Sequence, residues 1–456
     1  MKARAVIFGC ALITIILLLG GCSFKIMPIN ELIRAPKLMG ENAALQEAFE
    51  GFIKNAPVTL KTPAAGDSRS AYVFHDIDGD GVNEAFVFYA FKSDPKSIRM
   101  NMLVNDGRGR WESVYDEQGA GSEVFSVDFV DLNSSGEKEV LVSWQFGENR
   151  GRKSLSVFAC EYHEGKISGL SQLISEEQYV EMLAVDMDVD GKTELFLVNI
   201  SPEGRGGVRL LGLDPYVLKG TVDLDLRGVM YKPLKYDFFG EDEDRVCRVY
   251  IDTEIIAAGE PAMITEIIKW NKKSGLLFSP LYTNDINIRM IKEECRDFDG
   301  DGIIEIPGFT SLYDSSIFYY ETSENKAVYM NSWSRYLGDG EWSAVYEYIE
   351  NPVNRYRFDI PEEWKGRFAV YIDAAENSMT FFELDSEKKT DEDRPWFNIH
   401  AYTEENWKKI EFNNPESRIV QRREGIVYVC EIFPWGYELP DMDMEFISGR
   451  IWFYDK

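Results

Sequence analysis

Histidine is scarce in this chain, and the linear motifs of the common enzyme classes are missing. The 456 residues include only three histidines, His75, His163 and His400, which lie far apart. Their spacing indicates no Ser-His-Asp or Cys-His arrangement, and HExxH, GxSxG, P-loop and GxGxxG motifs are absent. The sequence therefore predicts a protein that is not an enzyme, although carboxylates paired only in the folded chain would leave no linear motif.

Cysteine is also scarce, and its spacing favours neither a zinc site nor a disulfide scaffold. The six cysteines form no CxxC pair and no mixed His/Cys ligand pattern. Two of them, Cys10 and Cys22, lie in the amino-terminal segment. The other four are Cys160, Cys247, Cys295 and Cys430. A bridge between Cys247 and Cys295 is one interpretation, and separate buried thiols are the favoured one.

Basic residues are too few to balance the acidic ones. Lys and Arg total 49 against 78 Asp and Glu, which gives a formal net charge of -29. Such a surface repels nucleic acids and anionic lipid headgroups, so neither is an expected partner. The hydrophobic content of 45% is sufficient for more than one core, and the length predicts two or three domains.

The amino terminus has the pattern of an export signal. Lys2 and Arg4 precede an apolar run, Ala5 to Leu19, which is short for a membrane span. The run ends in Leu-Gly-Gly-Cys at 19–22, which resembles the lipobox of bacterial lipoproteins. The resemblance implies a signal peptide over 1–21, lipidation of Cys22 and attachment to the extracytoplasmic face of the cell membrane. An ordinary signal peptide or an uncleaved anchor are the alternatives.

Residues 22–59 are expected to contain a tether and one amphipathic helix. From Asn42 to Lys54, the apolar residues Leu45, Ala48, Phe49, Phe52 and Ile53 recur at helical spacing, with Pro57 beyond the end. The apolar side is expected to pack against the neighbouring domain and not to bind a partner.

An acidic loop recurs along the chain. FHDIDGDGVNE at 74–84 is followed by VDLNSSGEKE at 130–139, VDMDVDGKTE at 185–194 and RDFDGDGIIE at 296–305. Their first aspartates, Asp76, Asp131, Asp186 and Asp297, are 55, 55 and 111 residues apart. The doubled interval predicts a degenerate copy near 241, in the acidic turn from Asp237 to Asp244.

The flanking segments are rich in Val, Phe, Leu and Tyr, which predicts strands. An EF-hand would need helices and an acid at position twelve, where this chain has Val87, Leu197 and Gly308. An acid recurs instead at position nine, and glycine at position six permits a sharp turn. Each loop therefore connects the two strands of a hairpin.

Oxygen ligands without histidine or cysteine favour calcium, and we expect three or four structural Ca²⁺ ions. The ligands are expected at positions one, three, five and nine, with the backbone carbonyl of position seven. In the three full copies these residues are Asp76, Asp78, Asp80, Val82 and Glu84; Asp186, Asp188, Asp190, Lys192 and Glu194; and Asp297, Asp299, Asp301, Ile303 and Glu305. The second copy is weaker, with Asp131, Asn133, Ser135, Glu137 and Glu139. The copy near 241 is not counted as a site, and solvated turns without an ion are the alternative.

The DxDxDGxxE loop between hydrophobic strands, repeated about every 55 residues, resembles the FG-GAP/VCBS repeats of integrin-α-like β-propellers. The resemblance implies a mainly β fold over residues 60–350, a propeller of about five four-stranded blades with calcium in its loops. A larger ring that recruits strands from the carboxyl-terminal region is the alternative.

The repeat does not continue into residues 353–456. Their sequence predicts a small α+β domain, with several strands and a helix over TEENWKKI. The opening YRFDIPEEWKG faintly resembles PsbP-like or Mog1-like domains. Its tryptophans are expected to lie in the core, and a stacking platform of Trp364, Trp396 and Trp435 is the alternative.

Two functions fit these features. The first is a lipid-anchored, calcium-binding module for adhesion or assembly, whose partner is an envelope protein or glycan that the sequence does not identify. The alternative is a surface polysaccharide hydrolase or lyase that uses paired carboxylates on one propeller face.

Overall fold

The computed structural model describes the chain from residue 41 onward, with internal gaps. The described ranges are 41–146, 149–200, 205–213, 216–223, 230–241, 244–257, 259–280, 288–289, 292–311, 329–384, 390–413, 417–439 and 442–454. The predicted signal peptide and the lipidation residue Cys22 lie outside them. Within these ranges no helix has both the length and the apolar character needed to cross a bilayer.

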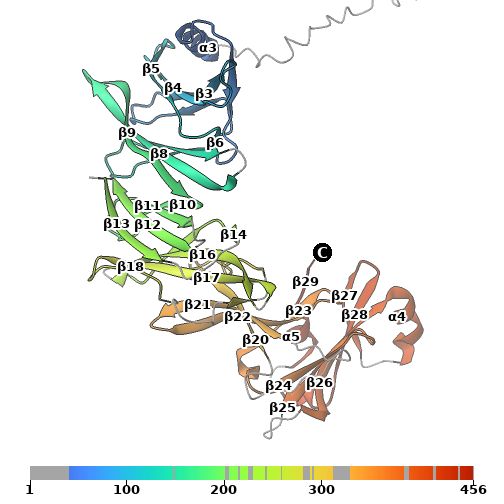
Figure 1. Cartoon of the computed structure of the whole chain (residues 1–456). Coiled ribbons are helices and arrows are strands. Elements are labelled where there is room, and N and C mark those ends of the chain that lie inside the picture. The colour runs from blue at the N-terminus through green and yellow to red at the C-terminus, as the bar shows by residue number, and fades with distance from the viewer. Residues whose placement is uncertain are drawn as a thin grey trace, which may run out of the picture. The chain divides into compact units, whose positions relative to one another are not determined.

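The predicted fold class is confirmed, because the described chain is mainly β and its few helices are short (Figure 1). Six sheets built from antiparallel pairs follow one another along the described chain. Five of them begin within the predicted repeat region, in agreement with the expected blade number. By contacts the chain divides into two compact units: residues up to Thr62 with Ser70–Gly119 and Glu161–Gly169, and the remainder.

In its described residues the first unit contains helix α3, the first sheet and the segment Glu161–Gly169. Its elements are α3 (Glu41–Phe52), β1 (Val58–Lys61), β2 (Tyr72–His75), β3 (Glu84–Phe91), β4 (Arg99–Asn105) and β5 (Trp111–Gln118). Both β1 and β2 pair with the same edge of β3, so five strands fill four positions. Leu45, Phe49 and Ile53 of the helical segment are buried against β3 and β4, as the periodicity predicts, whereas Phe52 is 41% exposed and does not belong to this side.

Two four-stranded sheets follow, each in chain order. The first consists of β6 (Glu123–Val130), β7 (Glu139–Phe146), β8 (Asn149–His163) and β9 (Lys166–Tyr179). The second consists of β10 (Glu181–Val185), β11 (Glu194–Ile200), β12 (Gly206–Leu213) and β13 (Tyr216–Asp223). Their second strands are almost wholly buried, which explains why these strands read as continuous apolar runs.

The fourth sheet contains six strands, but two pairs of short strands each share one edge of a long strand, so the sheet is four strands wide. These are β14 (Met230–Tyr231), β15 (Lys235–Phe239), β16 (Val246–Ala257), β17 (Glu260–Asn271), β18 (Leu276–Phe278) and β19 (Ile288–Arg289). Two of them, β14 and β15, line one edge of β16, whereas β18 and β19 line one edge of β17.

The fifth sheet joins the repeat region to the end of the chain. It consists of β20 (Ile306–Ser311), β21 (Tyr329–Gly338), β22 (Glu341–Asn351), β23 (Tyr356–Asp359) and the final strand β29 (Ile451–Phe453). Because β29 pairs with β23, the last strand of the chain returns to the sheet that contains the last acidic loop.

The sixth sheet carries the α+β character of the carboxyl-terminal region. Its strands are β24 (Phe368–Asp373), β25 (Ser378–Leu384), β26 (Thr390–Thr403), β27 (Arg418–Arg423) and β28 (Ile426–Ile432), accompanied by α4 (Glu404–Ile410) and α5 (Met444–Ser448). Short 3-10 turns lie at Glu362–Trp364, Glu411–Asn413 and Gly436–Glu438. Trp364 and Trp396 are buried in one aromatic core, while Trp435 is partly exposed, so these three do not form an open platform.

The four cysteines within the described ranges are free thiols. Three of them, Cys247, Cys295 and Cys430, are buried, as the favoured interpretation predicted. Burial raises the pKa of the Cys247 thiol to about 12, which keeps it protonated.

Candidate metal centres

The acidic loops occupy the same place in their sheets. In the first three copies the loop connects the first strand position of the sheet to the second, whereas the last loop precedes β20 and only an isolated bridge lies before it. In every copy the residue before the loop pairs with the glutamate at position nine. The pairs are His75 with Glu84, Val130 with Glu139, Val185 with Glu194 and Arg296 with Glu305. The predicted hairpin position of the motif is therefore what the structure shows.

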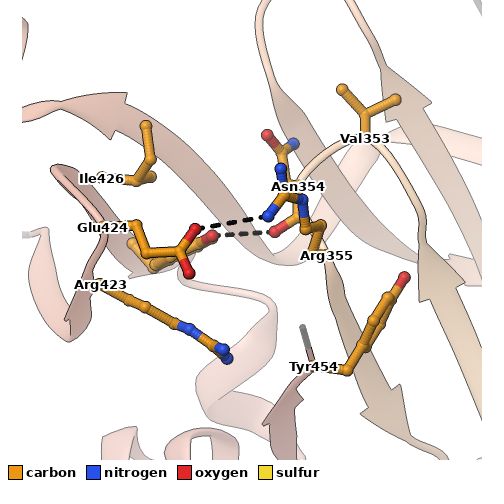
Figure 2. Close-up of a pocket in the computed structure, with 8 residues that line it drawn as sticks. Val353, Asn354, Arg355, Arg423, Glu424, Ile426 and Tyr454 are labelled. Carbon is orange, nitrogen blue, oxygen red and sulfur yellow. Dashed lines mark hydrogen bonds and ion pairs between the residues drawn. The ribbon is translucent and has the colours of Figure 1, made fainter. Parts of the chain in front are cut away.

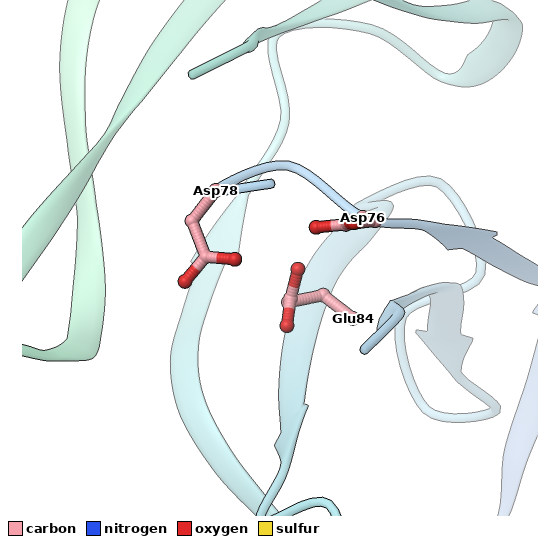
Figure 3. A group of neighbouring side chains, drawn as sticks. All are labelled: Asp76, Asp78 and Glu84. Atoms are coloured by element: carbon pink, nitrogen blue, oxygen red, sulfur yellow. The ribbon is translucent and has the colours of Figure 1, made fainter. Parts of the chain in front are cut away.

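The first loop illustrates the local geometry. Asp76 accepts backbone N–H groups of Gly79 and Gly81 at 2.8 and 2.9 Å, which folds the chain around the aspartate. Gly81 adopts a φ of 86°, a left-handed conformation that favours glycine. The Oε2 atom of Glu84 accepts the N–H of Ile77 at 3.2 Å, and the three carboxylates of Asp76, Asp78 and Glu84 converge (Figure 3).

The same contact between position two and position nine recurs in every copy of the motif. Leu132, Met187 and Phe298 each donate a backbone N–H to Oε2 of the following glutamate at 2.9 Å. All four glutamates are buried, with at most 5% of their surface exposed. One oxygen of each glutamate is therefore held by the loop, which leaves Oε1 to face the other acids.

The structure brings together positions one, three and nine in the three full copies. Ligand atoms within 4.8 Å of one another come from Asp76, Asp78 and Glu84; from Asp186, Asp188 and Glu194; and from Asp297, Asp299 and Glu305. The predicted position-five residues Asp80, Asp190 and Asp301 lie outside these groups, and each accepts the N–H of position seven. Each full loop therefore offers three clustered carboxylates.

The second copy differs, as its composition predicted. Asp131 keeps its contact with Gly136 at 2.8 Å, but an amide replaces the carboxylate at position three. Asn133 Nδ2 donates to Glu139 Oε1 at 3.4 Å, while Ser135 and Glu137 contact each other within the turn. Among the described residues this copy forms no group of three acids.

The copy predicted near 241 is a hairpin turn between β15 and β16, and its geometry explains why it is no site. Phe239 pairs with Val246, so the connection between β15 and β16 spans residues 240–245. The equivalent connection in the first loop, between the paired residues His75 and Glu84, spans residues 76–83. Val246 takes the place of the buried glutamate. The nearby Asp237 is buried and instead pairs with Arg248 at 2.6 Å.

In two loops of the second unit, the residue at position eight donates its backbone N–H to an acceptor outside its own loop. Thr193, at position eight of the third loop, donates its N–H to the carbonyl of Leu132 at 3.2 Å. Ile304, at position eight of the last loop, donates instead to Asp237 Oδ2 at 2.9 Å. In the degenerate copy a buried carboxylate thus replaces the backbone carbonyl that links successive sheets.

Two basic side chains that no sequence pattern singles out lie against these clusters. Lys219 Nζ lies 2.7 Å from Asp188 Oδ2 and 2.6 Å from Glu194 Oε1. Arg335 Nη2 lies 3.0 Å from Asp299 Oδ2 and 2.9 Å from Glu305 Oε1. Both come from strands more than twenty residues away from the loop, so only the sheet register brings them together.

The charge balance of the first loop differs from that of the third loop, which contains a paired lysine. Burial, reinforced by the neighbouring aspartates, raises the pKa of Glu84 to about 7. In the third loop, the salt bridges to Asp188 and Glu194 raise the pKa of Lys219 despite its partial burial, which keeps it charged. Within the described ranges, no lysine or arginine forms a salt bridge with the acid cluster of the first loop.

A separate small pocket lies in the carboxyl-terminal part, between the turn at Val353–Arg355 and the β27–β28 turn (Figure 2). It has a volume of about 320 Å³ and is closed at one side by the ion pair of Arg355 with Glu424 at 3.4 Å. Tyr428 donates its hydroxyl to the carbonyl of Asn354 at 2.9 Å. These contacts stabilise two adjoining turns and define no reactive group.

No protein-family profile and no curated protein matches the chain. Solved structures that are similar include the β-propeller domain of the Trilobed protease from Pyrococcus furiosus, with 10% identity, 72% of this chain and 93% of that chain covered, and a TM-score of 0.26. The catalytic domain of Coprinopsis cinerea GH62 α-L-arabinofuranosidase has 10% identity, 63% and 95% coverage and a TM-score of 0.22. Bacillus subtilis levansucrase has 9% identity, 64% and 85% coverage and a TM-score of 0.18.

Proposed function

We propose that this chain is a calcium-binding module for adhesion or assembly, anchored by lipid at Cys22 to the extracytoplasmic face of the cell membrane, and that it binds an envelope protein or glycan without catalysing a reaction. The observation that carries the proposal is the buried glutamate that closes each of the three full acidic loops and lies beside two aspartates. The resemblance of these loops to FG-GAP/VCBS repeats supports the same interpretation.

The first loop fits a calcium ion by its donor chemistry. Three carboxylates converge, Asp76 and Glu84 are fixed by backbone N–H groups, and no histidine or cysteine ligand lies in the group. Hard oxygen donors in a flexible turn suit Ca²⁺ better than a transition metal. When bound, the ion would neutralise part of the acid cluster and so stabilise the hairpin between β2 and β3.

The placement of the acids favours a structural ion over catalysis. In each full loop the carboxylates at positions one and nine already accept backbone N–H groups, which fixes them as ligands. A hydrolase or lyase would need a carboxylic acid free to give up its proton beside a second carboxylate. The proposed role of the loops is therefore to stiffen hairpins that present the remaining surface to a partner.

The test is a pull-down from envelope extracts of the source organism, with the mature chain as bait in calcium or in chelator. We expect at least one envelope protein or glycan to be retained only in calcium, and Asp78→Asn to lose it in both conditions. Retention of the same partners in calcium and in chelator would contradict calcium-dependent presentation. Release of reducing sugar from a polysaccharide by the pure protein would establish the enzymatic alternative.

A further inference from the structure

The third loop already contains a cation supplied by the chain. Lys219 Nζ contacts Asp188, Glu194 and, at 3.4 Å, Asp190, so three carboxylates of one loop surround a single ammonium group. Glu194 is 1% exposed, and its Oε2 accepts the N–H of Met187 while its Oε1 meets the lysine. The lysine therefore faces the oxygens that were expected to bind calcium.

The last loop has the same arrangement with a different residue. Arg335 contacts Asp299 and Glu305 through Nη2, and Asp301 through Nη1 at 2.9 Å. The two terminal nitrogens of a guanidinium lie in one plane, so Nη1 contacts position five while Nη2 contacts positions three and nine. Three acids of this loop are thus paired with one arginine.

A metal ion and these basic groups cannot occupy the loops together. Calcium bonds oxygen at about 2.3–2.6 Å, and the lysine nitrogen lies 2.6 and 2.7 Å from the oxygens of Glu194 and Asp188 that the ion would need. Two centres that both contact the same pair of oxygens would overlap, and their like charges would repel. The ion must therefore displace the side chain or stay out.

The two cations reach the loops from two defined positions of the sheet. Lys219 is the extra residue of a β-bulge in the fourth strand, since Leu210 pairs with Gly220 and Leu211 with Leu218. Its side chain crosses Gly212, whose missing Cβ leaves room for it. Arg335 lies instead on β21. It follows Ser334, which pairs with Ile306, and this register places Arg335 opposite Glu305.

The first loop has valine at both positions. Its bulge between β4 and β5 leaves Val114 unpaired, and Val104 follows the pair of Ala85 with Leu103, which places it opposite Glu84. Among the described residues no side-chain donor contacts Glu84 Oε1, and no salt bridge involves Asp76 or Asp78. Glu84 is 3% exposed, and its Oε2 accepts the backbone N–H of Ile77.

We propose that Lys219 and Arg335 are resident cations that take the place of the metal in the third and last loops, and that the first loop alone binds a divalent cation. The inference rests on the calcium-binding part of the proposed function and corrects the expectation of three or four ions. In the second loop the amide of Asn133 occupies the corresponding Glu139 oxygen without a positive charge.

Isothermal titration of the mature chain with CaCl₂ tests this count. We expect one Ca²⁺ per chain in the wild type, two in Lys219→Met, two in Arg335→Met and three in the double variant. Lys219→Arg and Arg335→Lys keep the charge and serve as matched controls, for which we expect one site. Asp188 Oδ1 is buried without a partner, so Lys219→Met is expected to open the tighter new site.

The reverse exchange tests the same reasoning in the first loop. Val114→Lys combined with Val104→Gly places a lysine at the bulge position beside the glycine that Gly212 provides in the third loop, and this double variant is expected to abolish calcium binding. Val114→Met combined with Val104→Gly is the matched control, which is expected to keep the site. Circular dichroism melts of each variant show whether it folds. Three sites in the wild type would overturn the resident cations and leave the proposed function standing, whereas no site would overturn calcium binding itself. Methionine variants that fold and still bind one ion would also overturn the inference.

Discussion

The buried ion pair of Asp237 with Arg248 gives the sharpest test of how the degenerate copy acts in the fold. Asp237 accepts Nε and Nη2 of Arg248 at 2.7 and 2.6 Å, the Tyr250 hydroxyl at 3.0 Å and the Ile304 N–H at 2.9 Å. Both charged side chains are at most 1% exposed. Asp237→Ala would leave a buried guanidinium whose remaining acceptor is the carbonyl of Tyr336.

Removal of one partner of a buried pair costs about 3–5 kcal/mol, and each buried donor left without an acceptor costs about 1–3 kcal/mol. Because these terms overlap, we expect Asp237→Ala to lower the free energy of unfolding by about 4 kcal/mol. Urea denaturation followed by tryptophan fluorescence measures it. A double-mutant cycle with Arg248→Met is expected to give a coupling energy of about 2 kcal/mol or more.

The exposed pair of Glu405 with Lys409 at 2.6 Å is the matched control, since such surface pairs contribute about 0.3–0.5 kcal/mol. Glu405→Ala should therefore change stability by less than about 1 kcal/mol. If Asp237→Ala is as mild as this control, or if the double variant loses the sum of the two single losses, the reasoning from burial is refuted.

Three further outcomes are expected. Asp78→Asn should abolish the rise in melting temperature on adding calcium, whereas Asp299→Asn should lower the melting temperature equally with and without calcium, because Arg335 and not an ion is its partner. In chelator the folded state binds the Glu84 proton more tightly than the unfolded chain does, because the pKa of Glu84 is raised on folding. The free energy of unfolding should therefore fall by about 1–2 kcal/mol, after solvent screening, as the pH rises from about 4.5 to 7, and Glu84→Gln should remove that fall. If the difference in stability between wild type and Glu84→Gln does not change with pH, the prediction is contradicted. Cys247, buried and with a raised pKa, should react with a thiol reagent only after denaturation, and rapid labelling in the native protein would contradict its burial.

Much of the repeat could be predicted because its chemistry is local. The 55-residue interval located the loops, and it also located the degenerate copy, where the β15–β16 turn lies. Position nine was selected because an acid recurred there, and the structure shows Glu84 and its equivalents buried beside the aspartates. These features depend on residues within one hairpin, so a single sequence contains them.

The rest depends on pairings between distant strands. Lys219 is charged like many surface lysines, and only the bulge in β13 turns it toward a loop 25 to 31 residues earlier. The return of β29 to β23 likewise joins residues nearly a hundred positions apart. No periodicity reports such contacts, because register and bulges are set by the packed sheet. The three acid clusters themselves were predicted, whereas the basic side chains proposed to fill two of them depend on such distant pairings.

A crystal structure of the mature chain grown in calcium, with anomalous data to locate the ions, would test the account most directly. If Lys219 and Arg335 are resident cations, the map will contain one calcium peak, bounded by Asp76, Asp78 and Glu84. The Lys219 ammonium and the Arg335 guanidinium will lie inside the third and the last acidic loop. Calcium peaks in those two loops with both basic side chains turned away, or no peak in the first loop, would contradict it.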